Sequence, residues 1–437
     1  MSRFPDPEVD LPRPLPPGGV ERPRLRMRSV GAALTALTAM AATSLVAGPA
    51  ISAPYAGSCK LERTSAHHSE GLDTWNRAYP RPVRTLNAVM VFLSFPDARP
   101  MTTPKELAAD YFPATSDFYG RASYGKFHLV PHPQRRWLRM PHSSTSYAIE
   151  RDWDTAHRGA YLRDALHTAD RHTDFRKFDV VYFVADPDAP GVDSDATKVV
   201  NFEKPMRADG TDIKRIVTVF EQHPPDRNVL AHETGHVFDL PDLYNRPTDG
   251  KGDWDTYVGD WDVMGSQFGL APDFLGWHKW KLGWLDRRQV VCVTSSRRVT
   301  LEPLTSAPAR PGAAPGTNGA PFGTGYGTKL AVVRTGEDSA IALEARSADG
   351  NDAATCSEGI LVYRVRSETA SGSGPVQVLD AHPDTDACFG DSVYPALADA
   401  PVQVGESYRV PGENVRIKVE GRTRSGSWTV KVGVGKG

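Results

Sequence analysis

Cysteine is scarce in this sequence, because only four of its 437 residues are Cys. No two of them have the C-x-x-C spacing, so a redox dithiol or a zinc site built from cysteines is not expected. An excess of one charge sign is also absent, since 51 Lys and Arg residues stand against 53 Asp and Glu residues. This near-neutral balance gives no electrostatic reason to expect a nucleic-acid partner.

The rest of the composition is that of a folded protein with many loops. Apolar residues make up 40% of the chain and charged residues 24%, which is typical of a water-soluble globule and excludes disorder along the whole length. The chain is too long for one ordinary hydrophobic core and suits two or three domains. The 38 Gly and 36 Pro residues favour long loops and β-rich regions over a helical bundle.

Charged residues are missing entirely between Ser29 and Cys59. The preceding segment is basic and contains Arg22, Arg24, Arg26 and Arg28. A basic segment, an apolar run and then small residues are the layout of a secretory signal peptide, so residues 1–53 predict export and a secreted protein. Met27 would be a tidier start for this signal. The alternative is an uncleaved anchor, but the run is mostly Ala and Thr, so no stable membrane anchor is expected.

All four cysteines follow this signal, and their even number in an exported protein predicts two disulfides. They are Cys59, Cys292, Cys356 and Cys388. Three pairings are possible. We favour Cys356–Cys388 within the C-terminal region and Cys59–Cys292 clasping the two ends of the preceding domain.

Hydrophobic patterns divide the chain after the signal into three parts. Residues 54–82 have the pattern of a short irregular lead or pro-segment. In residues 83–290 buried strands alternate with amphipathic helices. In residues 291–437 helix signals fade, and short alternating strands separated by Gly, Pro and Ser predict a β-sandwich with a flexible linker at 307–325. The predicted fold class is α+β.

Several elements of the first domain are clear enough to predict. The expected elements are strands at 86–95, 179–185 and 213–220 and a helix at 154–170. Another helix is expected to begin at Pro104, because Thr103 and Glu106 have the spacing of a capping box and Pro is favoured in the first turn.

The residues that carry chemistry lie in one short segment, AHETGHVFDLPDLY (231–244). His232 and His236 are four residues apart, so on a helix both imidazoles lie on one face, one turn apart, as a pair of zinc ligands. Glu233 follows the first histidine, where its carboxylate would reach a zinc-activated water without binding the metal. There it would act as the general base, taking the proton of the water and passing it to the leaving amine.

The H-E-x-x-H pattern alone is only suggestive, because two solvated histidines on a surface helix also produce it. Its context favours zinc, since a strand at 213–220 leads into the helix and Pro241 ends the helix just past the second histidine. Asp242 is our choice as the third ligand, because the chain leaves the helix at Pro241 and can swing back toward the metal. Asp239 and Glu221 stay open as alternatives.

Four stretches of the chain resemble the M6 (immune inhibitor A-type) family of secreted bacterial zinc metalloproteases, a zincin group related to the metzincins. They are VMVFLSFPDARP (89–100), DFYGRASYGKFHL (117–129), HETGHVFDLPDLY (232–244) and GDWDVMGSQFGLAPDFLGWHKWKLGW (259–284). The later IALEARS (341–347) and GILVYRV (359–365) also resemble the region that follows the catalytic domain in this family.

The resemblance implies a zincin fold and peptide-bond hydrolysis, with zinc held by the two histidines and an acid at the position of Asp242, and with Glu233 as the base. It also implies that Met264 forms a Met-turn beneath the metal. One position departs from the family, which usually has Gly where this chain has Asp239. The turn after the helix favours a left-handed backbone there, which Asp tolerates better than most residues.

For the weaker signals we prefer interpretations without a functional role. His67 and His68 could bind metal, but in an irregular lead a solvated pair is expected. Cys59 could cap the zinc of a zymogen as a thiolate, but that would strand another cysteine, so a disulfide is favoured. His278 is expected to be a packing or surface residue.

Two further features leave alternatives open. The acid-rich loops 186–195 and 248–262 could hold calcium, but neither has the EF-hand spacing, so solvated loops are expected. Tyr244 or Tyr257 could hydrogen-bond the oxyanion of a reacting carbonyl, and the sequence does not choose between them.

Together these features predict a secreted, monomeric zinc endopeptidase with one catalytic zinc, acting on protein or peptide substrates. One alternative is a secreted protein that keeps the zincin scaffold as a binding module without turnover. The presence of Glu233 speaks against it, because a pure scaffold has no need of that carboxylate. A second alternative is a zinc hydrolase of non-peptide amides or esters, which the sequence does not separate from a peptidase.

Overall fold

The structure, a computed structural model, describes residues 57–247, 251–307 and 325–435. The predicted signal at 1–53 and most of the predicted linker at 307–325 lie outside the described residues, so both stay predictions. Within the described ranges, no helix has the length and apolar character needed to cross a membrane.

The first sheet is mixed and has the strand order β2-β1-β3-β5-β4. Its strands are β1 (Thr85–Ser94), β2 (His128–Arg139), β3 (Val180–Ala185), β4 (Lys198–Ala208) and β5 (Thr211–Val219). Parallel pairing joins β1 to β2 and β3, and β3 to β5, whereas β4 runs antiparallel to β5 at the edge. The strands predicted at 86–95, 179–185 and 213–220 are β1, β3 and β5.

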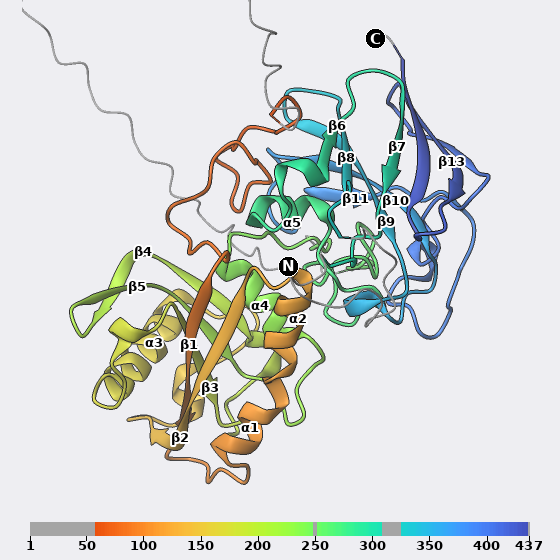
Figure 1. The fold of residues 1–437 in the computed structure, drawn as a ribbon. Coiled ribbons are helices and arrows are strands. Elements are labelled where there is room, and N and C mark those ends of the chain that lie inside the picture. The colour runs from red at the N-terminus through yellow and green to blue at the C-terminus, as the bar shows by residue number, and fades with distance from the viewer. Residues whose placement is uncertain (1–56, 248–250, 308–324, 436–437) are drawn as a thin grey trace, which may run out of the picture. The chain divides into compact units, whose positions relative to one another are not determined.

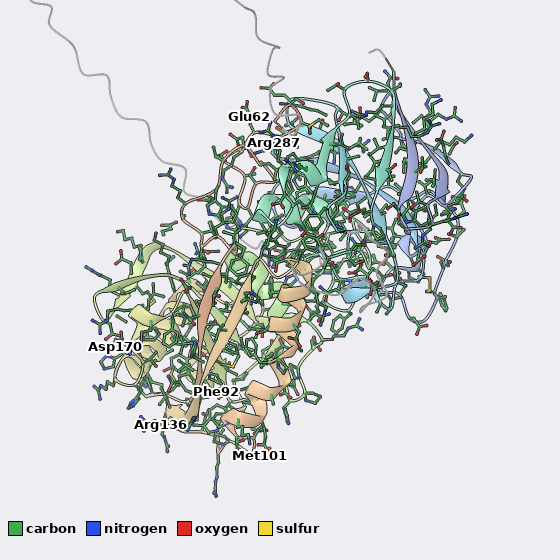
Figure 2. All side chains as sticks on the ribbon, viewed as in Figure 1. Glu62, Phe92, Met101, Arg136, Asp170 and Arg287 are labelled. Carbon is green, nitrogen blue, oxygen red and sulfur yellow. A yellow bond between two sulfur atoms is a disulfide. The ribbon has the colours of Figure 1, made fainter. Side chains whose placement is uncertain are left out.

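Helices cover both faces of this sheet, as Figure 1 shows. They are α1 (Pro104–Tyr111), α2 (Ala114–Ala122), α3 (Thr155–Asp170) and α4 (Val229–Val237). The predicted helix at 154–170 is α3, and its Tyr161 packs in the same cluster as Val91 of β1. Phe92, labelled in Figure 2, points to the opposite face, whose cluster also contains residues of α1, α2 and α4. The predicted capping box before α1 has both of its hydrogen bonds, between Thr103 and Glu106.

Two strands of this sheet, β2 and β4, were not expected from the sequence. Both are edge strands and both are largely exposed, so their side chains do not show the apolar alternation of a half-buried strand.

The C-terminal region contains two more sheets, in agreement with the predicted strands. One is β11 (Val376–Val378), β10 (Gly359–Arg366), β9 (Ser339–Arg346), β8 (Leu330–Arg334) and β6 (Val290–Cys292), in that order. The other is β12 (Ser407–Arg409), β13 (Val415–Arg422), β14 (Trp428–Val434) and β7 (Arg297–Leu301). Their facing side chains, such as Ile341 of β9 and Val430 of β14, form one hydrophobic cluster, as in a sandwich.

The five-stranded C-terminal sheet is buried on its other face as well. Leu361 and Tyr363 of β10 belong to the cluster that contains Phe92 of the first sheet and the residues around α5 (Gly276–Leu282). One continuous core therefore joins the C-terminal sheet to the part of the chain that carries the H-E-x-x-H segment.

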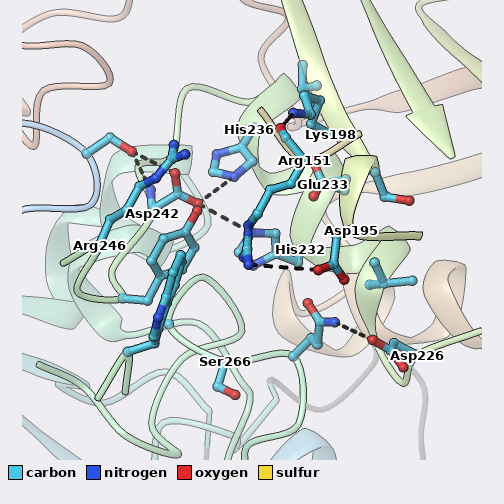
Figure 3. Close-up of a pocket in the computed structure, with 18 of the residues that line it drawn as sticks. Arg151, Asp195, Lys198, Asp226, His232, Glu233, His236, Asp242, Arg246 and Ser266 are labelled. Carbon is cyan, nitrogen blue, oxygen red and sulfur yellow. Dashed lines mark hydrogen bonds and ion pairs between the residues drawn. The ribbon is translucent and has the colours of Figure 1, made fainter. Parts of the chain in front are cut away.

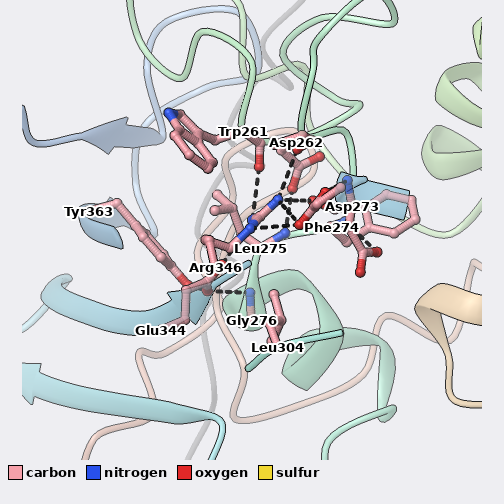
Figure 4. Close-up of polar contacts among 12 residues, drawn as sticks. Trp261, Asp262, Asp273, Phe274, Leu275, Gly276, Leu304, Glu344, Arg346 and Tyr363 are labelled. Atoms are coloured by element: carbon pink, nitrogen blue, oxygen red, sulfur yellow. Dashed lines mark hydrogen bonds and ion pairs between the residues drawn. The ribbon is translucent and has the colours of Figure 1, made fainter. Parts of the chain in front are cut away.

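A buried arginine reinforces this junction. Arg346 of β9 is fully buried and forms ion pairs with Glu344 and Asp352. Its guanidinium also donates hydrogen bonds to the carbonyl oxygens of Trp261, Ala271 and Asp273, which lie in the loop after α4 (Figure 4). Two carboxylates and three carbonyl groups thus satisfy a charge that would otherwise be costly to bury.

Both favoured disulfides are present. Cys59 is bonded to Cys292, and Cys356 is bonded to Cys388. Because Cys59 is committed to a disulfide, it has no thiolate with which to cap a metal, and the zymogen alternative for this residue is not supported.

Candidate metal centre

Helix α4 carries both histidines and the glutamate between them, and it ends earlier than predicted. We expected Pro241 to stop the helix, but the last helical residue is Val237. The chain reverses at Asp239, whose φ of 65° is left-handed, and the amide of Leu240 donates to the carbonyl of Gly235. This is the hydrogen-bond pattern of a Schellman motif, which turns the following residues back along the helix.

The two imidazoles are held in a matching way by backbone carbonyl groups. Nδ1 of His232 lies 2.8 Å from the carbonyl oxygen of Val263, and Nδ1 of His236 lies 2.8 Å from that of Leu240. A carbonyl can only accept, so each Nδ1 carries the hydrogen and each Nε2 is free to bind a cation or a proton.

Asp242 faces both Nε2 atoms. Its Oδ1 lies 3.0 Å from Nε2 of His236 and 3.4 Å from Nε2 of His232, as the dashed lines of Figure 3 mark. The other oxygen, Oδ2, accepts a hydrogen bond from the hydroxyl of Ser371, and that hydroxyl accepts one from the Asp242 amide. A residue 129 positions away in the sequence therefore fixes the carboxylate.

The charges of this group are strongly coupled. Burial favours the neutral form of Asp242, but His236 and His232 outweigh it and hold the pKa of the carboxyl well below its usual value. Burial likewise lowers the pKa of His236, but Asp242 outweighs it and raises the pKa to about 9. A proton therefore competes with a metal at His236, and metal binding should strengthen as the pH rises toward this value.

This donor set fits a zinc ion. The three candidate ligand atoms, from His232, His236 and Asp242, lie within 4.8 Å of one another. Two imidazole nitrogens and one carboxylate oxygen, with the second nitrogen of each ring hydrogen-bonded to the protein, are the ligands and the surroundings of a catalytic zinc site.

The two alternative third ligands lie elsewhere. Asp239 is buried, and its carboxylate contacts Arg63 at 2.6 Å and Nδ1 of His68 at 2.9 Å, outside the group of three donors. Glu221 lines the same cleft, where it accepts a hydrogen bond from the Asp226 amide, but it is not part of the donor group either.

Glu233 lies beside the donor group in a buried position. Burial raises the pKa of its carboxyl, although the neighbouring His232 and His236 oppose the shift. The backbone amide of Val199 in β4 also lowers the pKa of the Glu233 carboxyl, but by less than burial raises it. A carboxyl with a raised pKa is better suited to accept and release a proton than an ordinary glutamate.

The predicted Met264 packs directly under α4. A side-chain carbon added to Gly235 would lie 2.3 Å from the Met264 sulfur, so the helix and the methionine are in close contact between the two histidines. Asp262 holds this turn in place. Its Oδ1 accepts a hydrogen bond from the Met264 amide at 2.8 Å, and its Oδ2 accepts one from Nδ1 of His278 at 2.8 Å. His278 is fully buried, so of the two expected roles, packing or surface, the packing role is confirmed.

A cleft of about 490 Å³ surrounds the donor group (Figure 3). Residues 197–199 and Asn201 line the cleft, so the beginning of β4 borders it. Of the two candidate tyrosines, Tyr244 lines the cleft, whereas Tyr257 does not line it. Burial raises the pKa of Tyr244, so its hydroxyl keeps its proton.

Two expectations for the weaker signals are wrong in part. The lead is irregular and His67 is exposed, as expected, but His67 lines the cleft and His68 is buried and bonded to Asp239, so they are not a solvated pair. The loop 248–262 is not simply solvated either, because Asp260 and Asp262 at its end are buried and accept backbone amides. No sequence signal indicated the burial of His68, because its partner Asp239 lies 171 residues away along the chain.

A second group of potential ligands lies in the C-terminal region, at Asp380, His382 and Asp399. Here Nδ1 of His382 faces the carbonyl of Asp399 at 2.5 Å, and Nε2 faces the Glu406 carboxylate at 3.0 Å. Both ring nitrogens of His382 therefore already have protein partners, and we interpret the cluster as a hydrogen-bonded loop instead of a metal site. Calcium at the two predicted acidic loops stays a prediction.

Asp242→Ala should weaken zinc binding sharply. The substitution removes one of the three donors, so the loss should exceed the ~10–100-fold that follows removal of an outer hydrogen-bond partner. Competition with a chromogenic chelator measures this affinity. Glu221→Ala, in the same cleft, is the matched control and should change the affinity little; the reverse order would make Glu221 the ligand.

His278 should make stability depend on pH. Burial lowers the pKa of His278, but the Glu70 and Asp262 carboxylates outweigh it and raise the pKa to about 9. The stabilisation is therefore complete below the unfolded value near 6.5 and is lost as the pH rises through 9. His278→Gln should cost on the order of 3 kcal/mol more at pH 6 than at pH 9.5. Urea unfolding at both pH values measures this, with the exposed His142→Gln as the control; an equal cost at both would contradict it.

Comparisons with known proteins do not identify a family for this chain. No protein-family model matches the chain, and no curated protein matches it. Among solved structures it is similar to wild-type OgpA from Akkermansia muciniphila in two crystal forms, at 12% sequence identity in each. The first alignment covers 79% of this chain and 92% of OgpA with a TM-score of 0.27, and the second covers 62% and 75% with a TM-score of 0.25. Scores this low support no conclusion about fold or activity.

Proposed function

We propose that this protein is a secreted zinc-dependent endopeptidase with a zincin catalytic domain, as the resemblance to the M6 family implies. The observation that carries the proposal is the meeting of the donor group His232, His236 and Asp242 with the buried Glu233 in one cleft. The two disulfides agree with export, because they persist in oxidising compartments.

Each residue of the cleft has a distinct part in the proposed reaction. When bound, zinc supplies a Lewis acid that polarises the scissile carbonyl and makes water more acidic. Glu233 removes the proton of the attacking water and then delivers it to the leaving amine. Tyr244, whose hydroxyl keeps its proton, can donate a hydrogen bond to negative charge that develops on the carbonyl oxygen.

The edge strand favours a peptide over a small ester or amide. β4 is the last strand of its sheet, and its first residues, Lys198, Val199 and Asn201, border the cleft that contains Glu233. An extended peptide can add to such an edge as a further strand through main-chain hydrogen bonds. That arrangement would lay a peptide bond next to the metal centre.

A binding module without turnover is the less favoured function. Glu233 is buried, and burying a carboxyl costs folding free energy that a pure scaffold has no reason to spend. The resemblance and the donor group are compatible with both functions, so the difference has to be measured.

The experiment is zinc analysis and hydrolysis by the secreted full chain. One equivalent of zinc and cleavage of casein, abolished by a chelator and restored by zinc, is the expected result. A parallel panel of small amides and esters separates a peptidase from a hydrolase of non-peptide bonds. Zinc without any hydrolysis would favour the binding module, and the absence of zinc from the purified protein would overturn the proposal.

A further inference from the structure

The segment before β1 is built into the molecule rather than laid over it. Residues 57–82 contain no strand, yet Leu61, Ser69 and Glu70 are completely buried. The segment is tied to β6 by the disulfide between Cys59 and Cys292. Its backbone also accepts hydrogen bonds from buried tryptophans: Trp277 donates to the carbonyl of Glu70, and Trp284 to that of Pro82.

One route from this segment leads to the first histidine of the metal centre. The Glu70 carboxylate contacts Nε2 of His278 at 2.7 Å and lies 3.6 Å from Nζ of Lys281. The other nitrogen of His278 binds Asp262, which holds the turn at Met264. The carbonyl of Val263 in that turn accepts the hydrogen from Nδ1 of His232.

A second route leads to the other histidine. Arg63 and His68 of the segment both contact the Asp239 carboxylate, at 2.6 and 2.9 Å. Asp239 adopts the left-handed conformation that ends α4, which is uncommon for a residue other than glycine. The next residue, Leu240, supplies the carbonyl that holds Nδ1 of His236.

We infer that residues 57–82 are a permanent part of the working protein and position the two histidine ligands, instead of being a pro-segment removed on activation. This inference rests on the metal centre of the proposed function. Removing the segment would take Arg63 and His68 from Asp239, Glu70 from Lys281, and one of the two carboxylate partners from His278. An uncompensated buried charge is strongly destabilising. The segment also supplies His67 to the wall of the cleft, so its loss would change the cleft as well.

The test is to sever the segment in the full chain. A recognition sequence for a site-specific protease is inserted between Arg77 and Ala78, both of which are exposed. The Cys59→Ser/Cys292→Ser background removes the covalent tie, so no reductant is needed. The uncut protein of the same background is the control, and zinc content and Tm are read before and after cutting.

Three results are possible, and each decides the matter. A fragment that stays bound until the protein is denatured supports the inference, as does a fragment that leaves together with zinc and lowers Tm by on the order of 10 °C. A fragment that leaves while zinc content and Tm stay unchanged overturns it, and a gain of hydrolysis on release would make the segment a pro-segment. Tm still reports on the segment if the uncut protein proves to hold no zinc, which would overturn the proposed function alone.

A pair of point variants separates positioning from general stability. Glu70→Gln removes the charge facing His278 and Lys281. We expect zinc affinity to fall by up to ~10-fold, less than for a direct partner of a metal ligand, because Glu70 acts on His232 only through His278 and Asp262. Glu62→Gln makes the same chemical change at an exposed residue of the segment, labelled in Figure 2, and should leave zinc affinity unchanged. Equal affinities for the two variants would contradict the route through Glu70.

Discussion

Glu233→Gln should reduce peptide hydrolysis by ~10²–10⁴-fold while the protein still binds one zinc. Glutamine has nearly the same shape as glutamate and can stay in the buried site, but it cannot take a proton from water. None of the three candidate donors is changed, because these are His232, His236 and Asp242. Initial rates of peptide cleavage together with zinc analysis of the same samples measure both quantities.

Glu221→Gln is the matched control for this prediction. Its carboxyl lines the same cleft, and burial raises its pKa to about 6, so it has a similar environment without facing the donor group. We expect it to change the rate far less than Glu233→Gln does. Equal losses for both variants, or a fully active Glu233→Gln protein, would end the assignment of Glu233 as the base.

Arg346→Met should destabilise the protein by about 3–5 kcal/mol. Methionine is of similar length and apolar, but it leaves the carboxylates of Glu344 and Asp352 buried without their cation. It also removes the donors to the carbonyl groups of Trp261, Ala271 and Asp273. Urea unfolding at neutral pH measures the loss of unfolding free energy.

The control for Arg346 is an arginine in an exposed ion pair. Arg422 contacts Glu358 at 2.8 Å, but both side chains are more than a third exposed, so the pair is screened by water. Arg422→Met should therefore cost less than about 1 kcal/mol. If both variants cost the same, the buried network does not stabilise the junction between the C-terminal sheet and the loop after α4.

Elements with a strong local pattern were predictable. β1 and β3 are mostly apolar and buried on both faces, and the capping box before α1 uses residues only three positions apart. The edge strand β4 was missed, although it borders the cleft, because its exposed polar side chains show no alternation. An edge strand is exposed to solvent on one side. This exposure weakens its apolar pattern and also leaves its backbone free to pair with a peptide.

The sequence by itself determined the pair His232 and His236 and the glutamate between them, because a helix brings residues four apart to one face whatever surrounds it. It also indicated Asp242, but for an incomplete reason, since the left-handed turn at Asp239 and not Pro241 ends the helix.

Only the tertiary structure decided what holds these ligands. Ser371 lies 129 residues from Asp242, and Glu70 lies 208 residues from His278, so no local pattern relates them. The role of Asp239 was likewise decided by Arg63 and His68, which meet it only in the folded chain. Spacing along a helix is a local property, whereas the partners of a buried charge depend on which distant segments the common core brings together.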